Sequence, residues 1–402
     1  MNDSSIPQPN VQPSGHDGAP WAGVRVVDLS GLSGAYGTRV WAALGAEVIA
    51  VEPPQGSPLR SMPPFAPGVD APENGLWWAY HGAGKQSVVL DPATDGDTLA
   101  ALLATADVVI DDAPASEIDR PVWGRRAVRT RNSDVTWISI TPFGSTGPRK
   151  DWRGSDLIGW ASCGLASTIG FADRAPLAAA AEVQLLLHYT SMHAAAAGML
   201  AMRGRRRGLG GQEVDVSIQE IGLSLSPETG VPLYLDDQVA RPRAGNRRPV
   251  TSPMGLFPCA DGFVAIIIVQ PAHWTAMAEW MHEVSGNEGV LDDIFIDMVM
   301  RREASEAIDL WVEDLTTRST KRDLFMEGQR RGIPITPVNT VADLRNDAHL
   351  AAIGWWRAEE HPELGSYMVP GSPFVTPDDW WAWRRAPLLG EHTDDVLGAL
   401  DG

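Results

Sequence analysis

The 402-residue sequence has only two cysteines, Cys163 and Cys259, and it lacks a long uncharged apolar run. Two cysteines are too few for a disulfide framework, and a membrane span needs roughly 18 or more consecutive apolar residues. The composition therefore predicts neither a disulfide-stapled domain nor a membrane-spanning helix. We expect a cytoplasmic protein.

Basic residues are also scarce, because 32 Lys and Arg stand against 51 Asp and Glu, a formal net charge of −19. A field of that sign repels polyanions, so we expect no nucleic-acid partner and no anionic membrane as partner. The densest basic cluster, residues 203–207, follows an apolar helical stretch. Cations at that position interact favourably with the helix dipole, which predicts a solvated cap.

Familiar site motifs are missing as well. Residues 31–37 contain three glycines after a strand, but without the G-x-G-x-x-G spacing that lets the backbone approach a pyrophosphate, so no dinucleotide site is predicted. His188 and His193 lie five residues apart, a spacing that does not stack two ligands on one helical face, so no metal site is predicted. Asp156 opens an apolar helix, either as a catalytic carboxylate or as its N-cap.

Short apolar strands alternate with helical stretches over the first half of the chain, which predicts an α/β fold with a mostly parallel sheet. We expect strands at 24–29, 47–51, 87–90, 107–110 and 135–140, and helices at 38–44, 97–104 and 182–202. The Pro-rich start has no apolar signal-peptide core and predicts a disordered lead-in. The predicted divisions are a lead-in at 1–20, the N-terminal part of a large domain at 21–218, a linker and smaller α+β domain at 219–334, and the C-terminal part of the large domain at 335–402.

Several motifs, in order along the chain, resemble those of the family III CoA-transferases. They include Thr38-Arg-x-x-Ala-x-Leu-Gly-Ala-Glu-Val-Ile49, Gly84-Lys85-x-Ser87-Val-x-Leu-Asp91, Phe143-Gly-x-Thr-Gly-Pro148, Gly211-Gln-x-Val-Asp-Val-Ser217 and Pro387-Leu-Leu-Gly-Glu-His-Thr-Asp394. The resemblance runs from about residue 21 to the end. It implies a Rossmann-like large domain built from both chain ends, a small domain between them, and two chains interlocked as a dimer.

The resemblance also implies an activity, the transfer of CoA from an acyl-CoA to a carboxylic acid. In the family an aspartate attacks the thioester, an anhydride forms, and CoA thiolate returns to give an enzyme-bound thioester. No cofactor is bound permanently, and CoA and acyl-CoA are substrates. Here the aspartate's position falls on His188, and a glycine four residues later is Met192. An imidazole cannot form an acyl anhydride, so very low transfer by a homodimer is implied. Glu182 or Asp156 substitutes if the alignment slips.

The family's CoA-holding positions are better kept. Arg60 and Arg120 fall where the family places cations near the CoA phosphates, and a guanidinium fork matches phosphate oxygens. Lys85 lies in the matching loop. An asparagine expected near the adenosine is Asp112, which adds a negative charge there.

Two functions therefore stand side by side. The chain is either a CoA-transferase with an unusual site, or a non-catalytic subunit that pairs with an Asp-bearing paralogue in a heteromeric enzyme. The racemase branch of the family is disfavoured, because Ser155 and His188 replace both of its acid–base residues. The sequence names neither the acyl donor nor the acceptor.

Overall fold

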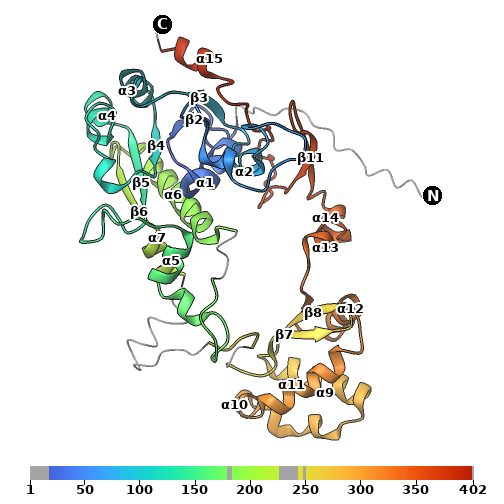
Figure 1. The fold of residues 1–402 in the computed structure, drawn as a ribbon. Coiled ribbons are helices and arrows are strands. Elements are labelled where there is room, and N and C mark those ends of the chain that lie inside the picture. The colour runs from blue at the N-terminus through green and yellow to red at the C-terminus, as the bar shows by residue number, and fades with distance from the viewer. Residues whose placement is uncertain (1–17, 179–182, 226–242, 248–249, 401–402) are drawn as a thin grey trace, which may run out of the picture. The chain divides into compact units, whose positions relative to one another are not determined.

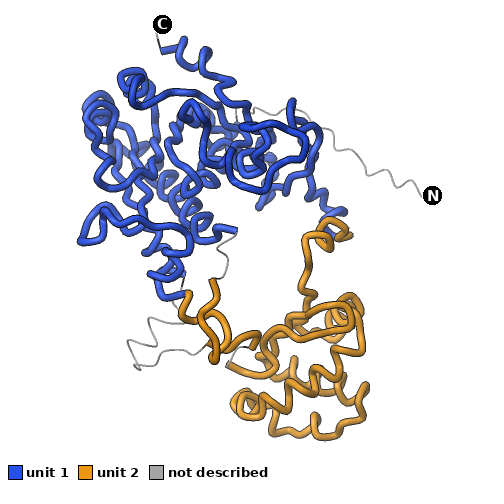
Figure 2. Tube along the Cα trace, viewed as in Figure 1, with its two compact units in different colours: residues 1–165, 180–227, 349–402 blue, residues 166–179, 228–348 orange. Residues whose placement is uncertain are grey.

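The structure of the chain is a computed structural model, and it describes residues 18–178, 183–225, 243–247 and 250–400. The chain forms two compact units, which Figure 2 distinguishes by colour. Unit 1 comprises residues 1–165, 180–227 and 349–402, and unit 2 comprises residues 166–179 and 228–348. Residues 1–17 of the predicted lead-in lie outside the described residues.

Unit 1 contains a six-stranded sheet with the order β3-β2-β1-β4-β5-β6 (Figure 1). Its strands are β1 Arg25–Asp28, β2 Glu47–Glu52, β3 Gln86–Val89, β4 Val108–Asp111, β5 Thr136–Thr141 and β6 Glu213–Ser217. All neighbouring strands in it pair in parallel, which confirms the predicted α/β class. The strand order reverses between β1 and β4, and ligands of open α/β sheets commonly bind beyond the carboxyl ends of the strands at such a point.

Helices cover both faces of this sheet. The helices of unit 1 are α1 Leu32–Ala43, α2 Leu76–His81, α3 Gly96–Ala104, α4 Arg125–Arg131, α5 Asp156–Ser162, α6 Leu185–Arg205, α7 Ile218–Ser224 and α15 Thr393–Gly398. Because successive strand residues point to opposite faces, Trp137 of β5 packs in one cluster with Leu99 of α3 and Val396 of α15. Its neighbour Ile138 lies on the other face, against Gly198 of α6.

Helix α1 begins at Leu32, six residues before its predicted start, and takes in Gly34 and Gly37. The backbone N–H of Gly37 donates to Ser191 Oγ of α6 at 2.6 Å. A Cβ atom at Gly37 would lie only 2.3 Å from the Ser191 carbonyl oxygen. This glycine therefore permits the close approach of α1 and α6, which gives it a role without a dinucleotide.

Unit 2 contains a three-stranded antiparallel sheet of β7 Met254–Cys259, β8 Gly262–Ile267 and β9 Ile335–Pro337, in that order. Its helices are α9 Pro271–Ser285, α10 Met298–Glu303, α11 Ser305–Thr316, α12 Lys321–Arg331 and α13 Val341–Arg345. Phe257, Trp274, Ile308 and Leu324 are buried in one core here. Strand β9 pairs with β8, so the segment after residue 334 packs in unit 2 before the chain returns to unit 1.

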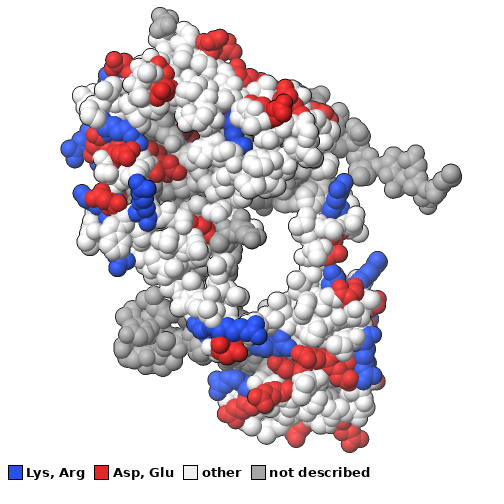
Figure 3. Space-filling view, viewed as in Figure 1, with Lys and Arg blue, Asp and Glu red and all other residues white. Residues whose placement is uncertain are grey.

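The remaining elements are α14, Ala348–Ala352, and a hairpin of β10, Arg357–His361, with β11, Gly365–Val369. None of the helices in the described ranges is both long enough and apolar enough to cross a bilayer. On the face drawn in Figure 3, Lys and Arg side chains lie beside Asp and Glu side chains in both units. That mixture fits the many ion pairs along the chain and the acidic balance of the sequence.

Candidate active site

His188 lies in the first turn of α6, where the resemblance places the family's nucleophile. Its Nδ1 contacts the carbonyl oxygen of Gln184 at 2.9 Å, one helical turn back. Its Nε2 lies 3.0 Å from Nε2 of His81, the last residue of α2. The imidazole of His188 therefore contacts a backbone carbonyl through Nδ1 and a second imidazole through Nε2.

His81 is held in the same manner as its partner. Its Nδ1 contacts the carbonyl oxygen of Trp77 at 2.9 Å. The side chain is buried, with only 2% of the residue exposed, whereas His188 is half-buried. Burial lowers the pKa of His81 to about 3, and the nearby cations Lys85 and Arg39 contribute to that direction.

Aromatic rings surround the two histidines. Trp77 stacks on His81 with ring centroids 5.3 Å apart, and Tyr36 of α1 lies 5.6 Å from His188. Tyr80 meets His81 edge to face with ring centroids 5.0 Å apart, and the guanidinium of the buried Arg39 lies 3.8 Å from the centroid of the Tyr80 ring. The pair therefore lies in an aromatic environment beside a buried cation, in which electrostatic interactions are weakly screened.

Asp156 does not join this pair by a hydrogen bond. It is fully buried at the start of α5, and its Oδ1 accepts from the backbone N–H of Leu187 at 3.0 Å. The N-cap of α5 is Ser155, whose Oγ accepts from the N–H of Ile158, so the N-cap reading of Asp156 was wrong by one residue. Asp156 instead joins α5 to the start of α6. Burial raises its pKa.

The other proposed substitute, Glu182, lies outside the described residues. Met192, at the position of the family glycine, is 41% exposed on α6. Leu185 and Tyr189 of the same helix are also exposed. His188 is thus bordered by an accessible apolar surface that could contact an acyl chain.

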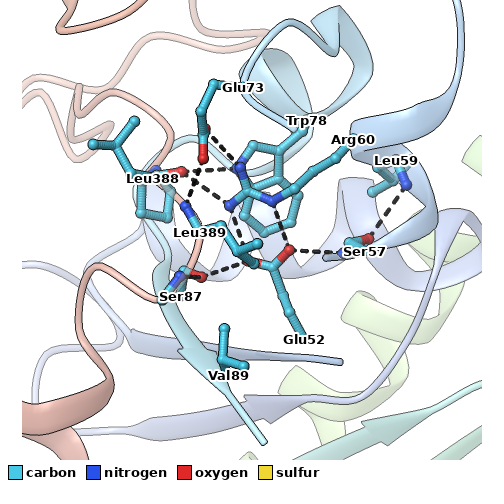
Figure 4. Close-up of polar contacts among 12 residues, drawn as sticks. Glu52, Ser57, Leu59, Arg60, Glu73, Trp78, Ser87, Val89, Leu388 and Leu389 are labelled. Atoms are coloured by element: carbon cyan, nitrogen blue, oxygen red, sulfur yellow. Dashed lines mark hydrogen bonds and ion pairs between the residues drawn. The ribbon is translucent and has the colours of Figure 1, made fainter. Parts of the chain in front are cut away.

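Arg60, one of the three proposed CoA ligands, lies in a closed polar cluster (Figure 4). Its side chain is 1% exposed, and it makes two hydrogen bonds to Glu52 of β2, at 2.7 and 3.0 Å. It also pairs with Glu73 at 2.8 Å and donates to the carbonyl oxygen of Pro387. Its guanidinium lies 4.3 Å from the ring centroid of Trp78. Arg60 could reach a phosphate only by giving up a buried carboxylate.

Lys85, the second of them, is similarly enclosed. Its ammonium donates to Asp28 Oδ2 of β1 at 3.0 Å, and both side chains are almost fully buried. Thr38 and Ser30 donate to the same carboxylate. Lys85 therefore compensates a carboxylate at the carboxyl end of β1.

Arg120, the third, keeps 17% of its side chain exposed. It pairs with Asp111, at the end of β4, at 3.0 Å and lies 4.0 Å over the ring of Trp123. Asp112 follows on the chain and accepts from the Gly31 N–H and from Ser33 Oγ. Burial raises the pKa of Asp112 to about 6. Asp111 and Asp112 thus stand at the reversal point of the sheet, and Arg120 is the accessible cation beside them.

The sequence analysis missed His81, Tyr36 and Arg39. His81 ends the run Trp77-Trp78-Ala79-Tyr80-His81, whose tryptophans suggest core packing rather than a site. A histidine just before the Gly84-Lys85 motif was the available signal. No sequence spacing links it to His188, because the two side chains come from different helices that only the fold brings together. Among the residues that the structure describes, no group of three or more His, Cys, Asp or Glu side chains could hold a metal ion.

Comparisons with known proteins agree over almost the whole chain. Residues 21–393 match the family model described as CoA-transferase family III. The succinyl-CoA:(R)-benzylsuccinate CoA-transferase subunit BbsE of Thauera aromatica is 30% identical, with 93% of this chain and 92% of that protein covered. The succinyl-CoA:mesaconate CoA-transferase of Haloarcula marismortui is 31% identical, with 93% and 94% covered. A crystal structure of a CaiB/BaiF family protein from Brucella suis superimposes with a TM-score of 0.83 at 25% identity, covering 95% of this chain and 100% of that one.

Proposed function

Because the chain belongs to CoA-transferase family III, we propose that it transfers CoA from an acyl-CoA to a carboxylic acid. The observation that carries this proposal is the match over residues 21–393, which includes residues from all three segments of unit 1 as well as unit 2. The parallel sheet supplies the reversal point at which α/β proteins bind nucleotide-like ligands. CoA is a substrate here, and no permanently bound cofactor is part of the proposal. We place the activity in the cytoplasm, as the scarcity of cysteine suggests.

We further propose succinyl-CoA as the first donor to test, because it is the donor in the names of both relatives described above. Arg120 is the cation that we assign to the CoA phosphates. It is accessible, whereas the charges of Arg60 and Lys85 are compensated by buried carboxylates. On this proposal the succinyl group of the donor binds beside His188 and the exposed side of α6.

A second candidate function has its own support. Each histidine of the pair contacts a backbone carbonyl through Nδ1, and the two rings contact each other through Nε2. No carboxylate of the described residues hydrogen-bonds to either ring. The relative from Thauera aromatica is named as a subunit. On this alternative, the chain is a non-catalytic subunit, and an Asp-bearing paralogue supplies the nucleophile.

Both candidates include a dimer, of two identical chains or of this chain with a paralogue. Large exposed apolar side chains outside the surface that borders His188 support the proposal, among them Leu200 of α6 and Leu209, each 69% exposed. Light scattering over a dilution series tests it. A monomer that persists at micromolar concentration, alone and with the paralogue, would contradict it.

Transfer itself is tested by incubating the purified chain with succinyl-CoA and a panel of carboxylic acids, then separating the CoA esters. The same panel is repeated with the Asp-bearing paralogue present. New CoA esters with the chain alone support the first candidate, and esters only in the mixture support the second. If neither sample forms a new ester with succinyl-CoA or with other acyl-CoAs, the proposed function is wrong.

A further inference from the structure

The protons of the histidine pair can be counted from its contacts. Carbonyl oxygens only accept hydrogen bonds, so the 2.9 Å contacts to Trp77 and Gln184 place a proton on each Nδ1. A neutral imidazole carries one N–H, which leaves both Nε2 atoms as acceptors. Two acceptors do not attract each other at 3.0 Å, so one further proton lies between the Nε2 atoms. The pair is then one imidazole and one imidazolium, and because burial lowers the pKa of His81 to about 3, His81 is the neutral ring that accepts the Nε2 proton of His188.

We propose that His81 and His188 use this shared proton as a general acid and base, giving it to the sulfur of CoA and taking it back. This inference rests on the proposed CoA transfer. His188 is the catalytic residue, because it is half-buried and borders the accessible side of α6. His81 is a positioning residue, because it is buried and its Nε2 contacts Nε2 of His188. The pair takes the place of a carboxylate nucleophile.

The proton balances a transfer in which the protein carries no acyl group. In the first half, a carboxylate oxygen of the acceptor acid attacks the thioester carbon. The carbon–sulfur bond breaks with its electron pair on sulfur, and the shared proton passes through His188 to that sulfur. The products are an anhydride of the two acids, CoA thiol and a neutral imidazole pair. One negative and one positive charge are lost together.

The second half reverses the proton movement. The neutral pair takes the proton from CoA thiol, and the thiolate attacks the anhydride carbonyl that belongs to the acceptor. The donor acid leaves as a carboxylate, and the pair regains its shared proton. Kinetics then follow a ternary complex, whereas an acyl-enzyme route gives ping-pong kinetics.

Burial, together with the cations Lys85 and Arg39 near the pair, lowers the pKa of His81, which favours the shared proton on the His188 side. Tyr36 and Arg39 of α1, Tyr80 of α2, Lys85 and Asp156 of α5 are the charged or titratable side chains nearest to it. Lys85 is compensated by Asp28, and Asp156 accepts from the Leu187 N–H. Neither of these two groups forms a salt bridge with the pair.

The test compares three variants of the full chain, His188→Gln, His81→Gln and His193→Gln. A glutamine at position 81 can still donate a hydrogen bond to His188 Nε2, but it cannot share a titrating proton. His193 is the control, because it lies on the same helix, is exposed, and its Nδ1 contacts the Tyr189 carbonyl oxygen rather than the histidine pair. Initial rates are measured with succinyl-CoA and the best acceptor acid across pH. Nitrogen NMR of histidine-labelled protein reports the protons on each ring.

We expect intersecting initial-rate lines, and loss of kcat by about 100-fold or more in His188→Gln and His81→Gln with KM little changed. His193→Gln should stay within about twofold, as expected of an exposed side chain away from the site. The parent rate should fall at high pH as the shared proton is lost, and NMR should show one Nε2 proton on the pair. Full activity of His81→Gln with the parent pH profile, or two unprotonated Nε2 atoms in the parent, would contradict the proposed acid–base pair. The proposed CoA transfer would be unaffected by either result. Absence of transfer by the parent alone would favour the second candidate function, and absence with the paralogue present as well would contradict the proposed function. In both cases NMR decides on proton sharing separately.

Discussion

Two polar clusters of unit 1 differ in how their charges are compensated. Around Arg60 the guanidinium meets Glu52, Glu73 and a backbone carbonyl, and the side chain is 1% exposed. Around His188 two imidazoles meet each other and two carbonyls among aromatic rings, and one of them is half-buried. A compensated buried charge holds the fold together, whereas a pair with a shared proton and an open side is available to a ligand. Both clusters contain residues that the family resemblance assigns to function, so residue type alone does not separate the two roles.

The largest expected effect is the loss of stability in Arg60→Ala. Removing one partner of a buried ion pair leaves Glu52 charged, buried and short of donors, which costs about 3–5 kcal/mol. Urea unfolding of the full chain measures it. The control is Arg126→Ala, whose side chain is 83% exposed in its pair with Asp119. The control should cost less than about 1 kcal/mol. A similar small cost for both variants would contradict the distinction between the clusters.

The charge of Asp112 is less fully compensated than that of Arg60. Its carboxylate accepts hydrogen bonds from the Gly31 N–H and from Ser33 Oγ, which are both neutral donors. Burial raises the pKa of Asp112 to about 6, from an ordinary value of 3.8, so the folded chain binds more protons than the unfolded chain between these pH values. Stability linked to this group therefore falls as pH rises from about 4 to 6, by up to about 3 kcal/mol. The Asp112→Asn variant should be more stable than the parent at pH 7.5 and equal to it near pH 4. Greater stability of the parent at pH 7.5 would show that the carboxylate is compensated.

Arg120 tests whether a partly exposed cation binds CoA, in contrast to the compensated and buried Arg60. If this accessible cation contacts a CoA phosphate, Arg120→Ala loses a charge-assisted hydrogen bond of about 1.5–3 kcal/mol. Calorimetry should then show CoA binding that is weaker by about 10- to 150-fold, together with a smaller salt dependence. Arg126→Ala is again the matched control. Unchanged affinity in Arg120→Ala would remove this residue from the site.

The smallest expected effect on stability is that of His188→Gln. The side chain is half-buried, and a glutamine can still donate to His81 Nε2, so we expect a change below about 1 kcal/mol. Urea unfolding beside Arg60→Ala measures it. A loss as large as that of Arg60→Ala would mean that the histidine pair is structural.

The strand pattern predicted the parallel sheet because each of the five predicted strands is a short apolar run, and their predicted bounds differ from the observed ones by at most one residue at each end. The start of α1 was missed, because Gly34 and Gly37 suggest a turn until their packing against α6 is known. The sequence located His188 through the family spacing. It could not identify His81 as its partner, because 107 residues separate them and only tertiary packing joins them. The compensation of Arg60 and Lys85 was likewise invisible, since their acidic partners lie on other strands and loops.

The most direct test of the account is a search for an acyl group on the protein during turnover. The chain is incubated with succinyl-CoA and an acceptor acid, trapped with hydroxylamine or borohydride, and analysed as peptides by mass spectrometry. We expect the acceptor's CoA ester to form while every Asp and Glu stays unmodified, because the histidine pair moves a proton and carries no acyl group. A trapped acyl group on the carboxylate of Glu182 or Asp156 would contradict this and would support the covalent mechanism of the family instead.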